Sequence, residues 1–121
     1  MAEIKYTFSD LIVTNKPKTI KLATLEGQLD ESNADVFAPK IYELIQSLEN
    51  ESTLILDMEK LSYINSKSIG YIADFYNKIT EKQGKLIIAK PAKNIQDILS
   101  VVGLDQMIPL TQTLEEAKLQ A

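Results

Sequence analysis

Apolar and polar residues alternate near the N-terminus, which predicts two strands. Ile4, Tyr6 and Phe8 share one face and the residues between them the other, the period-two pattern of a half-buried strand. The alternation returns over residues 19–25, after the turn-forming segment 15–18. Two such strands joined by a short turn predict an N-terminal hairpin.

Helical spacing of apolar residues begins after the polar cluster at 30–33. Pro39 lies inside this helical pattern, although proline fits only the first turn of a helix. We therefore expect a loose turn over 32–37 and a regular helix from about Ala38 to Leu48.

The strongest helical pattern covers residues 66–82. Its apolar residues fall on one arc and its charged residues on the other, and Gly84 is placed to end it. Asn94 is placed to cap a further helix. Thr113 and Glu116 have the spacing of a capping box, which predicts a short final helix.

Two apolar runs without alternation, 53–58 and 85–90, predict strands that are covered on both faces. Residues 104–110 are expected to form a linker or a short edge strand. Strands separated by helices imply a mostly parallel sheet. We expect a single α/β domain over 1–121, with a mixed four- to five-stranded sheet, an N-terminal hairpin and about four helices packed on it.

Composition removes several kinds of chemistry. The 121 residues include neither cysteine nor histidine, so thiol chemistry and the commonest general base and metal ligand are absent. The net charge of −4 comes without a basic stripe, which argues against nucleic acid as a partner. We see neither a signal peptide nor a membrane span and expect a cytoplasmic protein without catalytic residues, metal or cofactor.

Two polar positions remain as candidates for function. Asp57 ends a buried strand, and we interpret it as a carboxylate that accepts hydrogen bonds from backbone N–H groups. The cluster 65–68, Asn-Ser-Lys-Ser, has the composition of a helix N-cap. A cap does not explain Lys67, because a lysine in the first turn faces the positive end of the helix dipole.

The stretch around this cluster, LILDMEKLSYINSKSIGYI at 54–72, resembles the core of STAS domains, the fold of the bacterial anti-sigma factor antagonists. Further segments match the family in order and spacing, and together they extend the resemblance over Thr19–Ala117: residues 25–30 (LEGQLD), 102–105 (VGLD), 109–110 (PL) and 113–117 (TLEEA). The resemblance implies the fold already read from the pattern, and a role in transcription regulation.

In the family this helix opens with Asp-Ser-Ser-Gly, and the second serine is phosphorylated by a partner that is both a protein kinase and an anti-sigma factor. The unphosphorylated form binds that partner and frees the sigma factor. Matched position by position, Asn65 takes the place of the aspartate and Ser66 that of the first serine. Lys67 takes the place of the phospho-acceptor and Ser68 that of the glycine. The acceptor hydroxyl is therefore missing.

The resemblance implies a non-enzymatic protein-interaction module that uses the loop and helix start at 63–71. We expect it to bind a kinase-type anti-sigma factor or another regulatory protein without the usual phosphoserine switch. The expected contact residues are Asn65, Ser66, Lys67, Ser68 and Tyr71. Lys67 is expected to be exposed, as a contact requires.

Three alternatives stay open. Ser66 could replace the missing acceptor, because the helical wheel places it at the edge of the apolar arc and Ser68 on the flank of that arc. The chain could instead be a scaffold or a transporter-associated STAS subunit. It could also bind a nucleotide or other small molecule at the helix N-terminus over 65–70. A monomer or a weak dimer through the edge of the hairpin is expected.

Overall fold

In the computed structural model, which describes residues 2–14 and 18–121, the chain forms one five-stranded sheet with strand order β1-β2-β3-β4-β5. Part of the turn predicted at 15–18 lies outside the described residues. The strands and helices are β1 Ile4–Leu11, β2 Ile20–Leu29, α1 Ala34–Ser47, β3 Thr53–Ile64, α2 Ser66–Glu81, β4 Lys85–Ala89, α3 Lys93–Val101, a 3-10 turn Leu104–Gln106, β5 Leu110–Thr111 and α4 Leu114–Gln120.

The sheet is mixed, as predicted. β1 pairs with β2 in antiparallel orientation, whereas the pairs β2–β3, β3–β4 and β4–β5 are parallel. The N-terminal hairpin and the α/β fold class are therefore confirmed. β5 is a two-residue edge strand, one of the two forms expected for 104–110.

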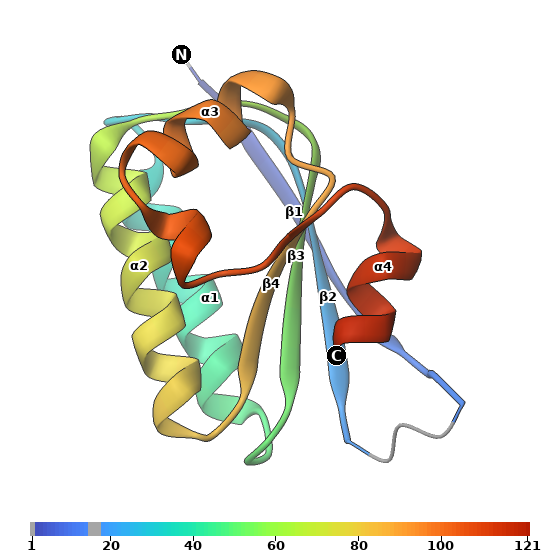
Figure 1. Cartoon of the computed structure of the whole chain (residues 1–121). Helices are drawn as coiled ribbons and strands as arrows, with labels where there is room; N and C mark the ends of the chain where they lie inside the picture. Colours follow the sequence, from blue (N-terminus) through green and yellow to red (C-terminus); the bar gives the residue numbers. More distant parts are fainter. Residues whose placement is uncertain (1, 15–17) are drawn as a thin grey trace.

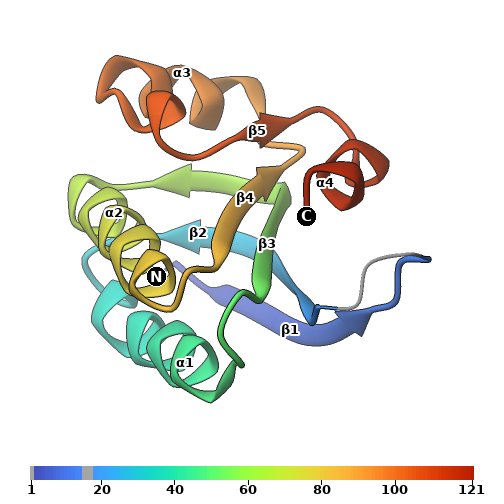
Figure 2. The same cartoon turned by 60° about the horizontal axis from the view of Figure 1, so that its bottom comes forward.

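Helices cover both faces of the sheet. Figure 1 shows α1 and α2 on one side and α4 on the other. The larger core lies between the sheet and α1, α2 and α3, and includes Leu56, Met58 and Phe75. A smaller core lies under α4, where Ala117 packs with Ile55 and Ile87. Figure 2 shows α1 and α2 side by side, with their N-terminal ends near the carboxyl ends of β2 and β3.

The predicted start of the first helix is wrong. α1 begins at Ala34 and carries Pro39 inside it, instead of a loose turn followed by a helix from Ala38. Pro39 cannot donate to the carbonyl of Asp35, but both residues are exposed, so that carbonyl can face water. Burial of Phe37 on the turn before Pro39 offsets this lost hydrogen bond.

β3 is longer than predicted. It continues past Met58, where the predicted strand ended, to Ile64, so that residues 63 and 64 of the expected loop belong to the strand. Its pairing with β2 contains two register shifts, the first between Thr24 and Glu26, and at each of them β3 has one residue more than β2. Such irregularities bend and twist paired strands without ending them. The consequence is that β3 itself leads directly to the start of α2.

Two residues, Gly84 and Lys82, determine the structure at the C-terminal end of α2. The N–H of Gly84 donates to the carbonyl of Ile79 at 2.9 Å, and a Cβ at Gly84 would lie 2.4 Å from the carbonyl oxygen of Ser52. Only glycine therefore fits, but for lack of space and not as the left-handed cap that was predicted, since the left-handed residue after α2 is Gln83 with a φ of 61°. Lys82 reaches across to the end of α1, where its ammonium donates to the carbonyls of three residues: Ile45, Gln46 and Leu48.

Asn94 does not have its predicted role. The N-cap of α3 is Ala92, and the Asn94 amide donates instead to the carbonyl of Ser62 at 3.0 Å. This bond fastens the start of α3 to the last part of β3. The capping box of α4 is present in part, since the hydroxyl of Thr113 accepts from the N–H of Glu116 at 3.1 Å.

Candidate functional site

The first turn of α2 is held by Asn65. Its N–H donates to the carbonyl of Leu29 at 3.1 Å, which ties the helix start to the end of β2. Its Oδ1 accepts from the N–H of Ser68 at 2.9 Å and from the Ser68 hydroxyl at 2.7 Å. The predicted N-cap is confirmed. Among the described residues, the buried Nδ2 of Asn65 has no hydrogen-bond partner.

The two serines of the cluster differ in access. Ser68 is 2% exposed, and its hydroxyl is already engaged with Asn65. Ser66 is exposed at the first position of the helix. The helical wheel placed the two serines in this way. Ser66 can therefore meet another protein, whereas Ser68 supports the turn from inside.

Lys67 is exposed, as predicted, with 45% of its side chain accessible. Its ammonium lies 2.7 Å from Oδ2 of Asp35, in the first turn of α1. The hydrogen bond from Lys67 and a second from Tyr71 lower the pKa of Asp35 below its ordinary value. The same bond with Asp35 raises the pKa of Lys67. Lys67 is thus charged at neutral pH and paired with a neighbouring helix.

Tyr71 completes this group one turn further along α2. Its hydroxyl donates to the other carboxylate oxygen of Asp35, and this bond raises the pKa of Tyr71. Its ring lies 6.3 Å from that of Tyr42 on α1 and 6.4 Å from that of Phe75. The structure therefore brings Lys67 and Tyr71 together on Asp35.

Asp35 was missed by the sequence analysis. The sequence contained a signal for it, because acidic residues are favoured in the first turn of a helix. That signal was hidden when the start of α1 was placed four residues too late. With α1 beginning at Ala34, Asp35 comes to face the first turn of α2.

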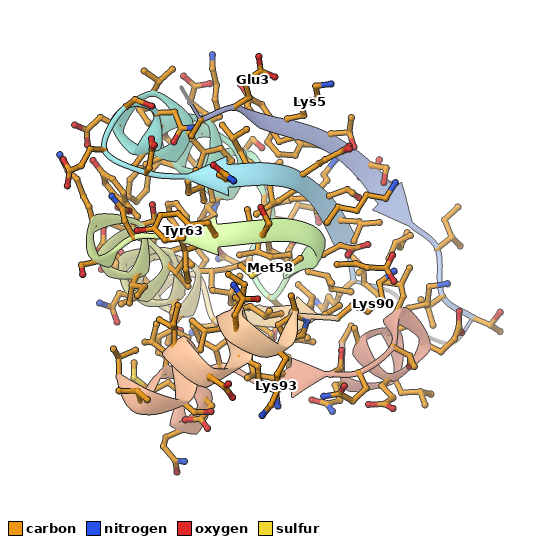
Figure 3. The ribbon with its side chains drawn as sticks, turned by 90° about the horizontal axis from the view of Figure 1, so that it is seen from above. Glu3, Lys5, Met58, Tyr63, Lys90 and Lys93 are labelled. Carbon is orange, nitrogen blue, oxygen red and sulfur yellow. The ribbon has the colours of Figure 1, made fainter. Side chains whose placement is uncertain are left out.

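Asp57 belongs to a separate polar group. It is 8% exposed, its Oδ1 accepts from the N–H of Glu59 at 3.1 Å, and its Oδ2 lies 3.3 Å from the ammonium of Lys90. The hydrogen bond from a backbone N–H to Asp57 was predicted, whereas the ion pair of Asp57 with Lys90 was not. In Figure 3, seen from above, Tyr63 lies near α2 and Lys90 lies towards α4, so this pair is separate from the helix start.

The described clefts lie away from the helix start. One of about 340 Å³ lies between the far ends of α1 and α2, beside Tyr42 and Lys82. Another of about 460 Å³ lies along β4, beside Tyr76 and Met107. No group of acidic residues over 2–14 and 18–121 is arranged to hold a metal ion. None of the helices described is both long enough and apolar enough to span a membrane.

Comparison with known proteins places this fold and motif in a family, since the STAS domain model matches residues 12–117. The chain belongs to the STAS domain family. It is 24% identical over 91 residues to the anti-sigma F factor antagonist of Paenibacillus polymyxa, which covers 75% of this chain and 77% of that protein. The recognised family and the predicted fold are both confirmed, and the chain is an anti-sigma factor antagonist-like STAS domain.

Two solved structures share the fold. The crystal structure of a Thermotoga maritima protein described as an anti-sigma factor antagonist superposes with a TM-score of 0.74 at 22% identity, covering 93% of this chain and 92% of that one. The murine anion transporter Slc26a9 contains a region with a TM-score of 0.75 at 17% identity, covering 95% of this chain and 22% of the transporter. At these identities the likeness concerns the fold alone.

Proposed function

We propose that this STAS domain is a non-catalytic regulatory module that binds a protein partner through the start of α2 and the adjoining first turn of α1. The proposal is supported chiefly by Lys67, an exposed lysine at the position where the family motif has its phospho-acceptor serine. STAS domains of this type are generally non-enzymatic. The partner is a kinase-type anti-sigma factor or another regulatory protein.

The contact surface consists of the predicted residues Asn65, Ser66, Lys67, Ser68 and Tyr71, extended by Asp35. Ser66 and Lys67 meet the partner directly, because both are exposed. Asn65 and Ser68 contribute indirectly, because their mutual hydrogen bond fixes the start of α2. Asp35, which also accepts from the Tyr71 hydroxyl, holds the Lys67 ammonium in one place.

Lys67 removes the usual switch from this surface. Its ammonium carries no hydroxyl and is paired with Asp35, so the surface stays in one charge state at neutral pH. Phosphorylation at the position of Lys67 is therefore absent. If a phosphate is used at all, it is on Ser66, where it would lie at the N-terminus of a helix, a site that favours anions.

The test is affinity capture from the native host with three forms of the chain, followed by phosphosite mapping on the same samples. The wild type should recover a regulatory protein, and Lys67→Glu should reduce its recovery about tenfold through reversed charge. Lys118→Glu is the matched control, since Lys118 lies in a similar ion pair on α4, on the other side of the sheet.

Equal recovery with Lys67→Glu and the wild type would remove Lys67 from the contact surface. Phosphate on Ser66 would show that the switch has moved by one residue, and phosphate on Ser68 would contradict its burial. Recovery of a membrane transporter in place of a kinase-type regulator would instead support a transporter-associated role. Binding of nucleotide to the purified domain, lost on changes at 65–70, would support a small-molecule site.

A further inference from the structure

β1 leaves one edge of the sheet open. It is the first strand in the sheet order and, among the described residues, pairs with β2 on one side only. It runs through Ile4–Leu11 without proline and without a shift in its register with β2. In Figure 3 the labelled side chains of Glu3 and Lys5 lie beyond this strand, and no helix or strand of the described residues does. Edge strands of this length template the addition of another strand unless they are bulged, shortened, covered or protected by charged side chains, and the charged residues of β1 are Lys5 and Asp10.

The register with β2 shows which backbone groups face the open edge. The N–H of Gln28 donates to the carbonyl of Glu3 at 2.8 Å, so residues 3 and 28 form a hydrogen-bonded pair. Hydrogen-bonded and non-hydrogen-bonded pairs alternate along an antiparallel ladder. The odd-numbered residues of β1 therefore bond to β2. The even-numbered residues, Ile4, Tyr6, Phe8 and Asp10, point their N–H and C=O groups outward.

Aromatic rings lie along the same edge, on the face that α1 covers. The Tyr6 ring packs edge-on against Phe37 of α1 at 5.5 Å and stacks on Phe8 at 5.6 Å. Phe8 remains 38% exposed. The aromatic cluster therefore begins in the core and ends at an uncovered ring beside the open backbone groups.

We propose that this edge binds a second copy of the chain, with β1 against β1 in antiparallel orientation about a two-fold axis through Thr7. A two-fold axis normal to the sheet keeps the helices of both copies on the same side of the joined sheet. Two residues that lie opposite each other across this axis must therefore have their side chains on the same face of the sheet. Centring on Thr7 pairs Ile4 with Asp10 and Tyr6 with Phe8 of the second copy. All four outward-facing residues are then used, whereas centring on Tyr6 or Phe8 leaves one of them unpaired.

The side chains are self-complementary in this register. Each Tyr6 lies opposite a Phe8, and aromatic pairs are among the favourable cross-strand neighbours. Lys5 lies opposite Ser9, and Asp10, which is already paired with Lys21, lies opposite Ile4, so no like charges meet. A foreign strand would have to match this pattern by chance, whereas a second copy matches it by symmetry. The result is a continuous sheet through two molecules.

The test uses the residue on the axis. Thr7 is exposed and would face Thr7 of the second copy as a non-hydrogen-bonded pair, the closer kind. Thr7→Lys and Thr7→Glu each place like charges there and should weaken self-association roughly tenfold. An equimolar mixture of the two variants places opposite charges there and should restore the dimer. Sedimentation equilibrium measures the mass of each sample over a range of concentrations.

Control variants separate this dimer from general effects of charge. Thr80→Lys and Thr80→Glu alter an exposed threonine of α2, away from β1, and should leave self-association unchanged. Phe8→Pro should also weaken it, because it removes an outward N–H while sparing the ladder to β2. Circular dichroism establishes that each variant is folded. A wild type that stays monomeric at millimolar concentration, or a dimer that neither Thr7 variant weakens, would overturn the proposal.

Discussion

Two lysines of α2 both reach α1, one from each end of the helix, but they bond to different partners. Lys67 lies in the first turn and pairs with the exposed carboxylate of Asp35. Lys82 lies just past the last turn and is half-buried, and it donates to three backbone carbonyls at the end of α1. The first contact joins two side chains, whereas the second completes the backbone hydrogen bonding of a helix.

This difference indicates that replacement of Lys67 leaves the stability of the fold nearly unchanged, whereas replacement of Lys82 lowers it. Exposed ion pairs contribute little to stability, because water and salt screen both charges. The last carbonyls of a helix have no partner within it, and a lysine that satisfies them also lies at the negative end of the dipole. Of the two lysine contacts, the one made by Lys82 therefore stabilises the fold, and the one made by Lys67 is free to serve recognition.

The largest effect that tests this comparison comes from Lys82→Met. The variant keeps most of the side-chain length but leaves the carbonyls of α1 without their charged donor, so we expect a loss of about 2 kcal/mol. Urea denaturation followed by circular dichroism measures it. Lys78→Met is the matched control, since Lys78 is an exposed lysine one turn earlier on α2. Equal losses in the two variants would show that the carbonyl contacts contribute nothing specific.

Asn65→Ala should have an intermediate effect at the other end of α2. The variant loses the acceptor for the Ser68 N–H and hydroxyl, and we expect a loss of about 1 kcal/mol. Asn65→Asp keeps an acceptor at the cap and should retain most of the stability. Urea titrations of the two variants therefore separate the cap from the side chain's other contacts. An alanine variant as stable as the wild type would contradict this role of the cap.

The smallest effect concerns the pH dependence of the Lys67 contact. Lys67 and Tyr71 lower the pKa of Asp35 from its ordinary value of 3.8 in the folded state. The stability that this carboxylate contributes is therefore present above about pH 4 and is lost as the pH falls through the lowered value. Asp35→Asn should make acid unfolding slightly less steep in thermal melts between neutral and acid pH.

Glu43→Gln, on the exposed face of α1, controls for the loss of a negative charge from that helix. The difference between wild type and Asp35→Asn should shrink in high salt, because both members of the pair are exposed. A pH dependence that is unchanged by Asp35→Asn would show that the contact with Lys67 is not maintained in solution.

Hydrophobic periodicity predicted the order of elements because it reports contacts that repeat along one face. The apolar arc of α2 and the unbroken apolar runs of β3 and β4 are patterns that report such repeated contacts. The start of α1 was misplaced because proline propensity is local, whereas burial of Phe37 is a tertiary gain that outweighs it. The end of β3 was missed for a similar reason, since β3 stays paired with β2 through polar residues by taking up one extra residue at each of two register shifts.

The candidate site was only half predictable. Asn65 and the Ser68 N–H that it caps lie within four consecutive residues, so the residue preferences of helix N-caps were enough to predict the contact. The pairs of Lys67 with Asp35 and of Asp57 with Lys90 join residues from different elements, and no local pattern contains them. Lys90 could have been anticipated, because it directly follows the apolar run of β4, and the apolar run of β3 that pairs with it leads to Asp57, although β3 itself continues to Ile64.

The uninterrupted course of β3 has a consequence for the kinetics of recognition. The strand runs from Thr53 to Ile64, and the next residue, Asn65, is bonded both to β2 and to the first turn of α2. No hinge therefore separates the central strand from the surface at 63–71. A surface that is already ordered gives up little conformational entropy on binding. Association of the proposed partner should then fit a single phase, without a slow step of rearrangement on this side.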